Sequence, residues 1–208
     1  MKKIAFSMLL LILSTMIFAR TITVSNTYES YEIQAAINSA KKGDVIVIKS
    51  GFYETSDALI IDGKSGITIQ GEGQVDIVCT VFAHVMEIKN SNNIIIENLH
   101  MVHSIRMNTE GAGCGETANV IEINNSDFIT IRKCELNGCG YIGVNSIDCP
   151  TITITDNYIH SNTYYGIIYM VEKKKPGLIT IKNNRMINNA NPIYYKDMDI
   201  YSDISGSK

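Results

Sequence analysis

The stretch TITITDNYI, residues 151–159, decides the fold because it recurs along the chain. Four segments align with it: GITIQG at 66–71, NIIIENLHM at 93–101, FITIRKCEL at 128–136 and LITIKNNRM at 178–186. Their first aligned isoleucines are Ile67, Ile94, Ile129, Ile152 and Ile179, so the spacings are 27, 35, 23 and 27 residues. A repeat of variable length indicates a solenoid in which loops of different size join equivalent strands.

Each repeat carries more than one strand. The stretches that precede the aligned segments are VMEI at 85–88, VIEI at 120–123, YIGV at 141–144 and GIIYM at 166–170. The apolar residues that follow the bend are Leu99 and Met101, Leu136, Ile159 and Met186. Three strands per repeat predict an all-β, three-sided parallel β-helix of about six coils, with isoleucine in inward columns. A leucine-rich repeat, the competing architecture, has leucine at fixed spacing and one strand per repeat.

Asparagine marks the bend after the aligned strand. Asn157 and Asn184 share one position there, where stacked amides would hydrogen-bond along the solenoid axis. Leu99 and Cys134 occupy the same position in earlier coils. Any asparagine ladder is therefore expected to be partial.

The start of the repeat region has a different pattern. Apolar residues at 33, 36, 37 and 40 fall at helical spacing, and Gly43 follows where a short helix would end. This opening, EIQAAINSAKKGDVIVIKSGFYE at 32–54 followed by ITIQGEG at 67–73, resembles the amino-terminal cap and first coil of the pectin-lyase-like superfamily. The later repeats resemble its generic right-handed β-helix region, and the resemblance covers about residues 21–195.

The resemblance implies a right-handed parallel β-helix with a short N-terminal capping helix over its open end. It also implies that substrates bind along the outer face of the strand that precedes each aligned segment. The strong activity signatures are missing, namely the paired aspartates and Gly-His-Gly of polygalacturonases, the Asp-Pro-His of alginate epimerases and the arginine cluster of pectate lyases. The resemblance therefore predicts the fold more specifically than an activity.

Alternation along that strand sorts its side chains into inward apolar and outward polar positions. The outward residues on neighbouring coils are Glu87, Lys89, Glu122, Asn124 and Asn145. Outward columns of any solenoid are polar, so solvated strand positions are the alternative interpretation.

These side chains suggest three kinds of chemistry. Glu87 and Glu122, one coil apart, would raise each other's affinity for protons and act as acid and base, or as nucleophile, in glycoside hydrolysis. The same carboxylates could bind Ca²⁺ as a cofactor, with Asn124 adding a further oxygen ligand. By the resemblance, Lys89 or Arg106 would instead be the base that removes the proton beside a uronate carboxylate.

The longest insertion, residues 104–119, contains Arg106 and is expected to wall this outer face. The next loops on the same edge carry Tyr141 and the segment around His160. The predicted substrate-binding residues are therefore Asn124, Tyr141, Asn145 and His160.

The first residues are typical of a secretory signal peptide. Lys2 and Lys3 precede an apolar run at 4–18, which is shorter than the roughly 20 residues that a spanning helix needs. We expect cleavage after Ala19, a β-helix domain at 20–195, a tail at 196–208 and a secreted or periplasmic location. No second long apolar run follows, so no membrane insertion is expected after cleavage, and the net charge of −3 without a basic stripe argues against nucleic acid.

Five cysteines fall in the part expected to be exported, where disulfides persist. No pair has zinc-site spacing, so no metal site is predicted from them. Cys114 and Cys139 are the preferred disulfide, with Cys79 as a competing partner for Cys114. Cys134 is predicted to be a buried thiol and Cys149 to lie at an exposed turn.

Two functional hypotheses follow. The first is an exported protein that binds or modifies a polysaccharide, as a lyase, hydrolase, epimerase-like or lectin-like protein. The second is a non-catalytic structural or adhesion solenoid, which the missing signatures favour.

Overall fold

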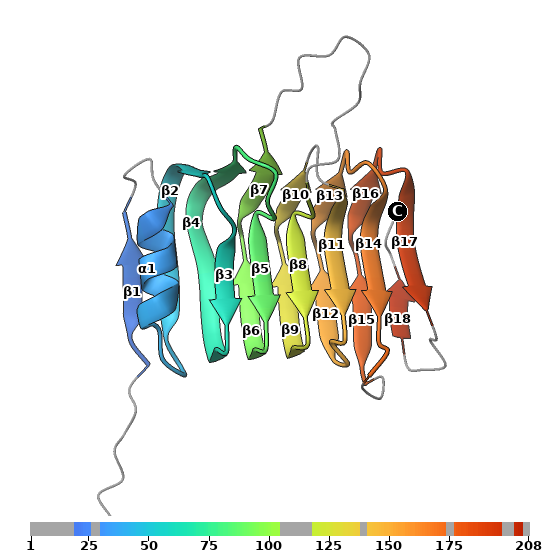
Figure 1. Cartoon of the computed structure of the whole chain (residues 1–208), viewed down its shortest axis with the longest axis horizontal. Helices are drawn as coiled ribbons and strands as arrows, with labels where there is room; N and C mark the ends of the chain where they lie inside the picture. The colour runs from blue at the N-terminus through green and yellow to red at the C-terminus, as the bar shows by residue number, and fades with distance from the viewer. Residues whose placement is uncertain are drawn as a thin grey trace, which may run out of the picture.

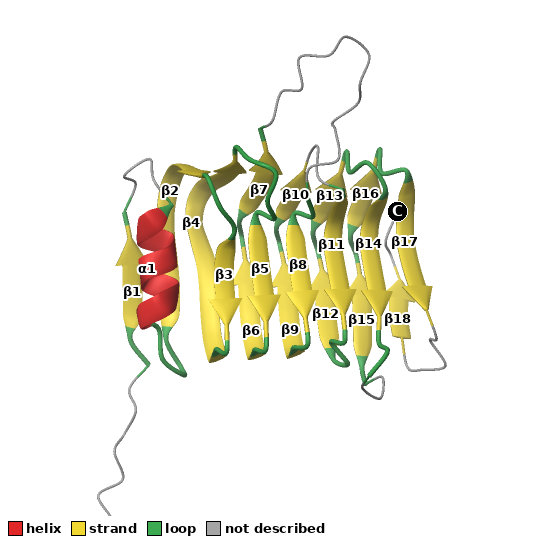
Figure 2. Cartoon of the chain, viewed as in Figure 1, coloured by secondary structure: helices red, strands yellow, loops and turns green. Residues whose placement is uncertain are grey.

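The computed structural model describes residues 19–25, 30–104, 118–137, 141–173, 177–196 and 202–205. Within these residues the chain forms a parallel β-solenoid, with its strands stacked side by side along the long axis (Figure 1). Figure 2 shows that strands make up almost all of the regular structure, with helix α1 (Tyr31–Ser39) at the N-terminal end. The predicted all-β parallel β-helix is confirmed.

The described strands form two parallel sheets that wrap around one core. The six-stranded sheet contains β3 (Leu59–Asp62), β5 (Met86–Lys89), β8 (Ile121–Asn124), β11 (Ile142–Ile147), β14 (Tyr165–Met170) and β17 (Asn191–Lys196). The larger sheet contains β1 (Thr21–Val24), β2 (Val45–Thr55), β4 (Ser65–Cys79), β6 (Asn92–Glu97), β7 (His100–His103), β9 (Asp127–Arg132), β10 (Glu135–Asn137), β12 (Ile152–Thr155), β13 (Tyr158–His160), β15 (Ile179–Lys182), β16 (Arg185–Ile187) and β18 (Ser202–Ser205).

The register of the strands matches the aligned repeats. Ile67 pairs with Ile94, Ile94 with Ile129, and Ile152 with both Ile129 and Ile179. All five isoleucines are at most 1% exposed, so they form one buried column. Because side chains alternate along a strand, this register also fixes which residues face outward.

Asparagine side chains at the bends between strands form hydrogen-bonded ladders along the solenoid. The Nδ2 of Asn157 donates to the Oδ1 of Asn184 at 2.9 Å, and the Oδ1 of Asn157 accepts the backbone N–H of Cys134 at 2.9 Å. This confirms the partial ladder. A second ladder, which the sequence alignment did not reveal, links Asn162 Nδ2 to Asn189 Oδ1 at 2.9 Å.

Both ends of the stack are extended beyond the predicted repeats. Helix α1 buries Ile33 and Ile37 against the first coil, as the capping-helix prediction requires. Strand β1, which was not predicted, pairs with β2, and β18 from the expected tail pairs with β15. No helix in the described part of the chain has the length and apolar character needed to cross a bilayer.

The cysteines follow the predictions in part. Cys134 is a buried free thiol, and burial raises its pKa to about 12. Cys149 is fully buried, because its side chain packs in the hydrophobic core. The prediction that it lies at an exposed turn is therefore wrong. Cys114 and Cys139 lie outside the described residues, and their pairing stays a prediction; Cys79 is a free, buried thiol.

Candidate functional site

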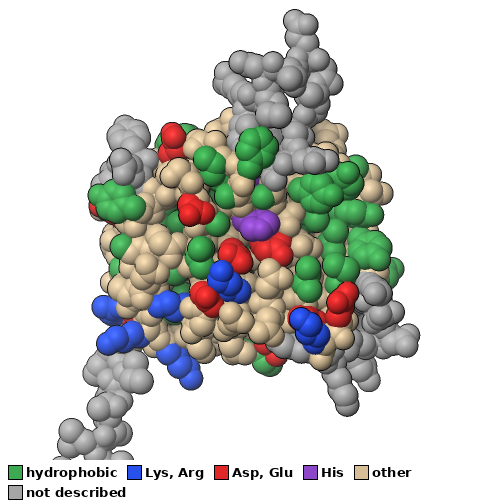
Figure 3. Space-filling view, in the orientation of Figure 1, with side chains coloured by type: hydrophobic (Ala, Val, Ile, Leu, Met, Phe, Trp, Pro, Cys, Tyr) green, Lys and Arg blue, Asp and Glu red, His purple; other side chains and the backbone are tan. Residues whose placement is uncertain are grey.

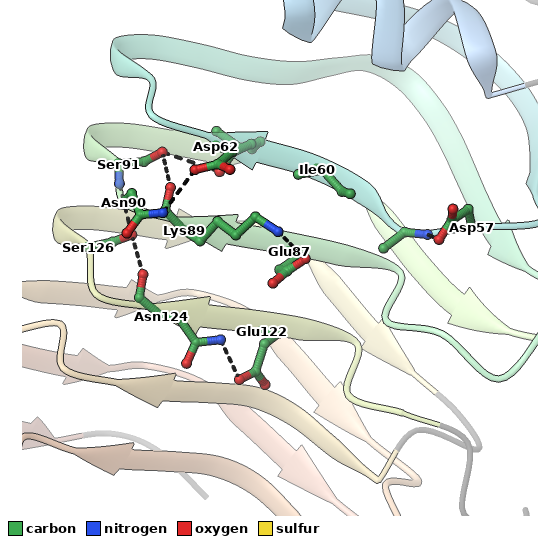
Figure 4. Close-up of polar contacts among 12 residues, drawn as sticks. Asp57, Ile60, Asp62, Glu87, Lys89, Asn90, Ser91, Glu122, Asn124 and Ser126 are labelled. Atoms are coloured by element: carbon green, nitrogen blue, oxygen red, sulfur yellow. Dashed lines mark hydrogen bonds and ion pairs between the residues drawn. The ribbon is translucent and has the colours of Figure 1, made fainter.

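The predicted polar residues meet on the outer face of the six-stranded sheet. Glu87 on β5 pairs in register with Glu122 on β8, and Glu122 pairs with Asn145 on β11. Lys89 and Asn124 are likewise register partners, two residues further along the same strands. Figure 4 shows Glu87 and Lys89 on β5, and Glu122 and Asn124 on β8, projecting on one side of the sheet.

Glu122 lies at the centre of this arrangement and is only 7% exposed. Its carboxylate accepts hydrogen bonds from three side-chain amides: Asn119 Nδ2 at 2.6 Å, Asn124 Nδ2 at 2.8 Å and Asn145 Nδ2 at 2.9 Å. Among the residues that the structure describes, no lysine, arginine or histidine forms an ion pair with Glu122. The carboxylate is therefore held by neutral donors alone, in a fixed orientation.

Two of these amides have an oxygen that makes no contact of its own. Asn119 Oδ1 and Asn145 Oδ1 are buried and have no hydrogen-bond partner within the described residues. The two residues are 8% and 9% exposed. Buried polar atoms are almost always paired in native proteins, so these two acceptors beside one carboxylate distinguish this part of the outer face.

Asn119 and His84 complete the site, and sequence analysis missed both. The backbone N–H of Asn119 donates to Nδ1 of His84 at 3.1 Å, so this nitrogen has its lone pair toward Asn119 and the ring proton is on Nε2. Both residues stand before their strands, where the alternation rule does not assign a direction. A histidine lies beside acidic side chains in the middle of this face (Figure 3).

Lys89 is held by a neighbouring acid. Its Nζ lies 3.2 Å from Oε2 of Glu87, and both side chains are partly exposed. A general base must face the proton that it removes, whereas the Nζ of Lys89 faces a carboxylate on its own strand. The described geometry thus suits Lys89 to charge pairing better than to proton abstraction.

A groove of about 920 Å³ lies on the same side, between α1 and β3. Its lining includes Tyr31, Glu54, Asp57, Ile60 and Asp62. Its floor adjoins the site, since Ile60 pairs with Glu87 and Asp62 with Lys89. No sequence pattern predicts this groove, because it depends on how the capping helix packs against the first coil.

Tyrosines lie toward the C-terminal end of the same sheet. Tyr141 packs on Tyr164 with ring centroids 4.2 Å apart, and Tyr165 packs on Tyr194 at 5.7 Å. Tyr194 continues the outward column of Glu122 and Asn145, through Ile168 of β14. Figure 3 shows a broad hydrophobic region on this side of the face.

One predicted residue lies elsewhere in the structure, and another is not described. His160 lies on β13 in the larger sheet, where its Nε2 contacts Oε1 of Glu135 at 3.1 Å. Arg106 lies outside the described residues, as does most of the insertion that carries it.

The described residues contain no group of three histidine, cysteine, aspartate or glutamate side chains that would hold a metal ion. For Ca²⁺, Asn124 turns its nitrogen rather than its oxygen toward Glu122, so its amide would have to rotate to serve as a ligand.

Solved structures with a similar fold share little sequence with this chain. An alginate lyase from Paenibacillus sp. strain FPU-7 superposes with a TM-score of 0.58 at 20% identity, over 90% of this chain and 63% of the lyase. A pectate lyase double variant from Xanthomonas campestris gives a TM-score of 0.42 at 15% identity, over 85% of this chain and 66% of that one. This chain therefore spans less than two thirds of the alginate lyase, and at these identities the likeness shows the fold alone.

No curated protein matches the sequence. A family model described as the right handed beta helix region matches residues 35–207, which is most of the chain and includes every coil. The expected kinship with pectin-lyase-like β-helices agrees with this match, and the chain belongs to the right-handed beta helix family.

Proposed function

We propose that the chain is an exported, secreted or periplasmic protein that binds a polysaccharide across the outer face of the six-stranded sheet. The observation that carries this proposal is the Glu122 site, in which a buried carboxylate is bordered by the unpartnered oxygens of Asn119 and Asn145. The predicted signal peptide at residues 1–19 supports export.

The free-energy cost of this arrangement supports a binding role. Burying a carboxylate without a cationic partner is unfavourable, and each buried unpaired polar atom costs about 1–3 kcal/mol. Both oxygens are buried, so a shift of the amide side chains would let a sugar hydroxyl donate to Asn119 Oδ1 or Asn145 Oδ1 and recover part of that cost.

The tyrosines extend the surface on which a sugar chain would lie. Tyrosine rings present apolar faces that pack on the C–H groups of a sugar ring, while their hydroxyl groups stay hydrated. Tyr194 is 41% exposed and lies in the same outward column as Asn145, two strands further along. A chain bound along the solenoid axis would meet both polar and aromatic groups.

Modification of the bound glycan is the second candidate. Glu87 and Glu122 are register partners on adjacent strands, and glycosidases place two carboxylates on either side of the bond they cleave. Arg106 remains the candidate base for a lyase reaction. A non-catalytic adhesion role is the remaining alternative.

The test is a glycan panel applied to the purified protein, with and without Ca²⁺. Titration calorimetry measures binding, while reducing-end release and the ultraviolet absorbance of unsaturated products report hydrolysis and lyase activity. Glu122→Gln keeps the size of the side chain but removes the charge that three amides surround, and we expect at least a tenfold loss of affinity. Glu72→Gln, an exposed carboxylate paired with Lys49 away from this site, is the matched control.

The outcomes separate the candidates. Binding without product supports a lectin-like protein, and a product that disappears in Glu122→Gln supports an enzyme. Absence of binding to every glycan would overturn the proposal and favour the structural solenoid. If Glu122→Gln leaves the affinity unchanged, the glycan binds at another place on the protein.

A further inference from the structure

We infer that the glycan bound at this site is built of uncharged sugars, which carry no carboxylate group. This inference rests on the proposed function and names the class of ligand for the same surface. It excludes the polyuronates, in which every sugar ring carries a negative charge.

The described surface around the site is strongly acidic. Five carboxylates line the groove and the adjoining strands: Glu54, Asp57, Asp62, Glu87 and Glu122. Neighbouring parallel strands lie about 4.8 Å apart, so Asp62, Glu87 and Glu122 on β3, β5 and β8 form a strip only about 10 Å long. A ligand with one carboxylate per ring would bring further negative charges into this short strip, and like charges repel at such distances.

Within the described residues, the two lysines of this surface, Lys64 and Lys89, already contact other groups. The Nζ of Lys64 donates to the carbonyl oxygens of Asn38 at 2.7 Å and Ala40 at 3.2 Å, below the capping helix. Lys89 pairs with Glu87, as described above. A uronate carboxylate would have to displace one of these partners before it could form an ion pair.

The hydrogen-bonding capacity of the site points to the same class. Asn119 Oδ1 and Asn145 Oδ1 are acceptors, and the carboxylate of Glu122 is also an acceptor. Sugar hydroxyl groups donate hydrogen bonds, whereas an ionised carboxylate only accepts them. Uronates and neutral sugars share ring hydroxyl groups that donate to such oxygens, so the discrimination lies in the carboxylate itself, which finds only acceptors beside Asn119 Oδ1, Asn145 Oδ1 and Glu122.

The groove and the Glu122 site lie side by side on one surface. Ile60 and Asp62 at the floor of the groove are register partners of Glu87 and Lys89, which in turn pair with Glu122 and Asn124. Figure 4 shows residues of all three strands in this order on one side of the sheet. A single sugar chain would cross the acidic groove and the Glu122 site together.

The experiment compares oligosaccharides that differ only in charge. Oligogalacturonates are titrated beside their full methyl esters, and cello-oligosaccharides beside the same chains oxidised to glucuronates at C6. For each pair that binds, we expect the uncharged member to bind at least tenfold more tightly. Raising the salt concentration should strengthen binding of the charged member by screening the repulsion and leave the uncharged member unaffected.

A charge variant tests the same inference in the opposite direction. Glu87→Gln removes one carboxylate and releases Lys89, so affinity for the charged member should rise at least fivefold. Glu72→Gln removes an acid that lies away from the surface and should change neither affinity.

Equal or tighter binding of the charged members, or binding of them that weakens with salt, would overturn this inference while leaving a glycan-binding protein. Failure of every member of every pair to bind would instead overturn the proposed function, and the inference with it.

Discussion

Asn145 on β11 donates a hydrogen bond of 2.9 Å from its Nδ2 to Oε2 of Glu122, which lies one coil earlier on β8. The bond joins two residues that are 23 positions apart in sequence. It also orients the amide so that its oxygen is left buried without a partner in the described part of the chain.

The first prediction concerns the Asn145 amide. Asn145→Ala removes a donor to Glu122 and one of the unpartnered oxygens, so glycan affinity should fall about tenfold, or about 1.4 kcal/mol. Asn124→Ala, the matched control, also removes one donor to Glu122 but none of the unpartnered oxygens, and it should cost less. Titration calorimetry measures both. Equal losses in the two variants would mean that the oxygen of Asn145 does not contact the ligand.

The second prediction concerns the asparagine ladder. Asn157→Leu removes the acceptor of the Cys134 N–H and the side-chain donors to Ile131 O and Asn184 Oδ1, which should lower the free energy of unfolding by about 3 kcal/mol. Leucine fits this column, since Leu99 occupies it in an earlier coil and is 2% exposed. Urea denaturation gives the value, with Asn137→Leu on the outside of β10 as control, expected within about 0.5 kcal/mol of the parent. A small effect at Asn157 would show that the ladder is dispensable.

The third prediction concerns the thiol of Cys134. Burial raises its pKa to about 12, and the thiol is 2% exposed, so it should stay protonated and inert near neutral pH. Alkylation with iodoacetamide, located by mass spectrometry, should modify Cys134 only when urea unfolds the protein. Modification of Cys134 in the native protein at the rate seen in urea would contradict the prediction.

The fourth prediction concerns stability in acid. The backbone N–H of Lys41 and the guanidinium of Arg20 hold the pKa of Asp44 below its ordinary value. The resulting stabilisation is complete above the unfolded-state pKa of about 3.9 and is lost as the pH falls through the lower folded-state value. Asp44→Asn should therefore lower the melting temperature near neutral pH and show a smaller decrease in strong acid than the parent.

Melting temperatures between about pH 2 and pH 7 provide the measurement, and Glu72→Gln serves as the control because its pair with Lys49 is exposed on both sides. A parent and an Asp44→Asn variant with parallel pH profiles would show that this carboxylate does not contribute to acid unfolding.

The sequence by itself determined the coiled repeat and which side chains of each strand face inward or outward. Alternation with a period of two allows one register that buries every isoleucine of the Ile67 to Ile179 column, and this register brings Glu87, Glu122 and Asn145 into one outward column. The same logic predicted the Asn157 and Asn184 ladder. These features follow from local periodicity, which a solenoid repeats at each coil.

Only the tertiary structure decided what surrounds that column. Asn119 and His84 stand at loop ends outside the alternating pattern, Cys149 turns into the core, and His160 lies on another side of the coil. The groove exists because α1 packs beside β3. Sequence periodicity fixes whether a strand residue faces inward or outward, but the path of a loop and the packing of a capping helix depend on contacts between residues far apart in the chain.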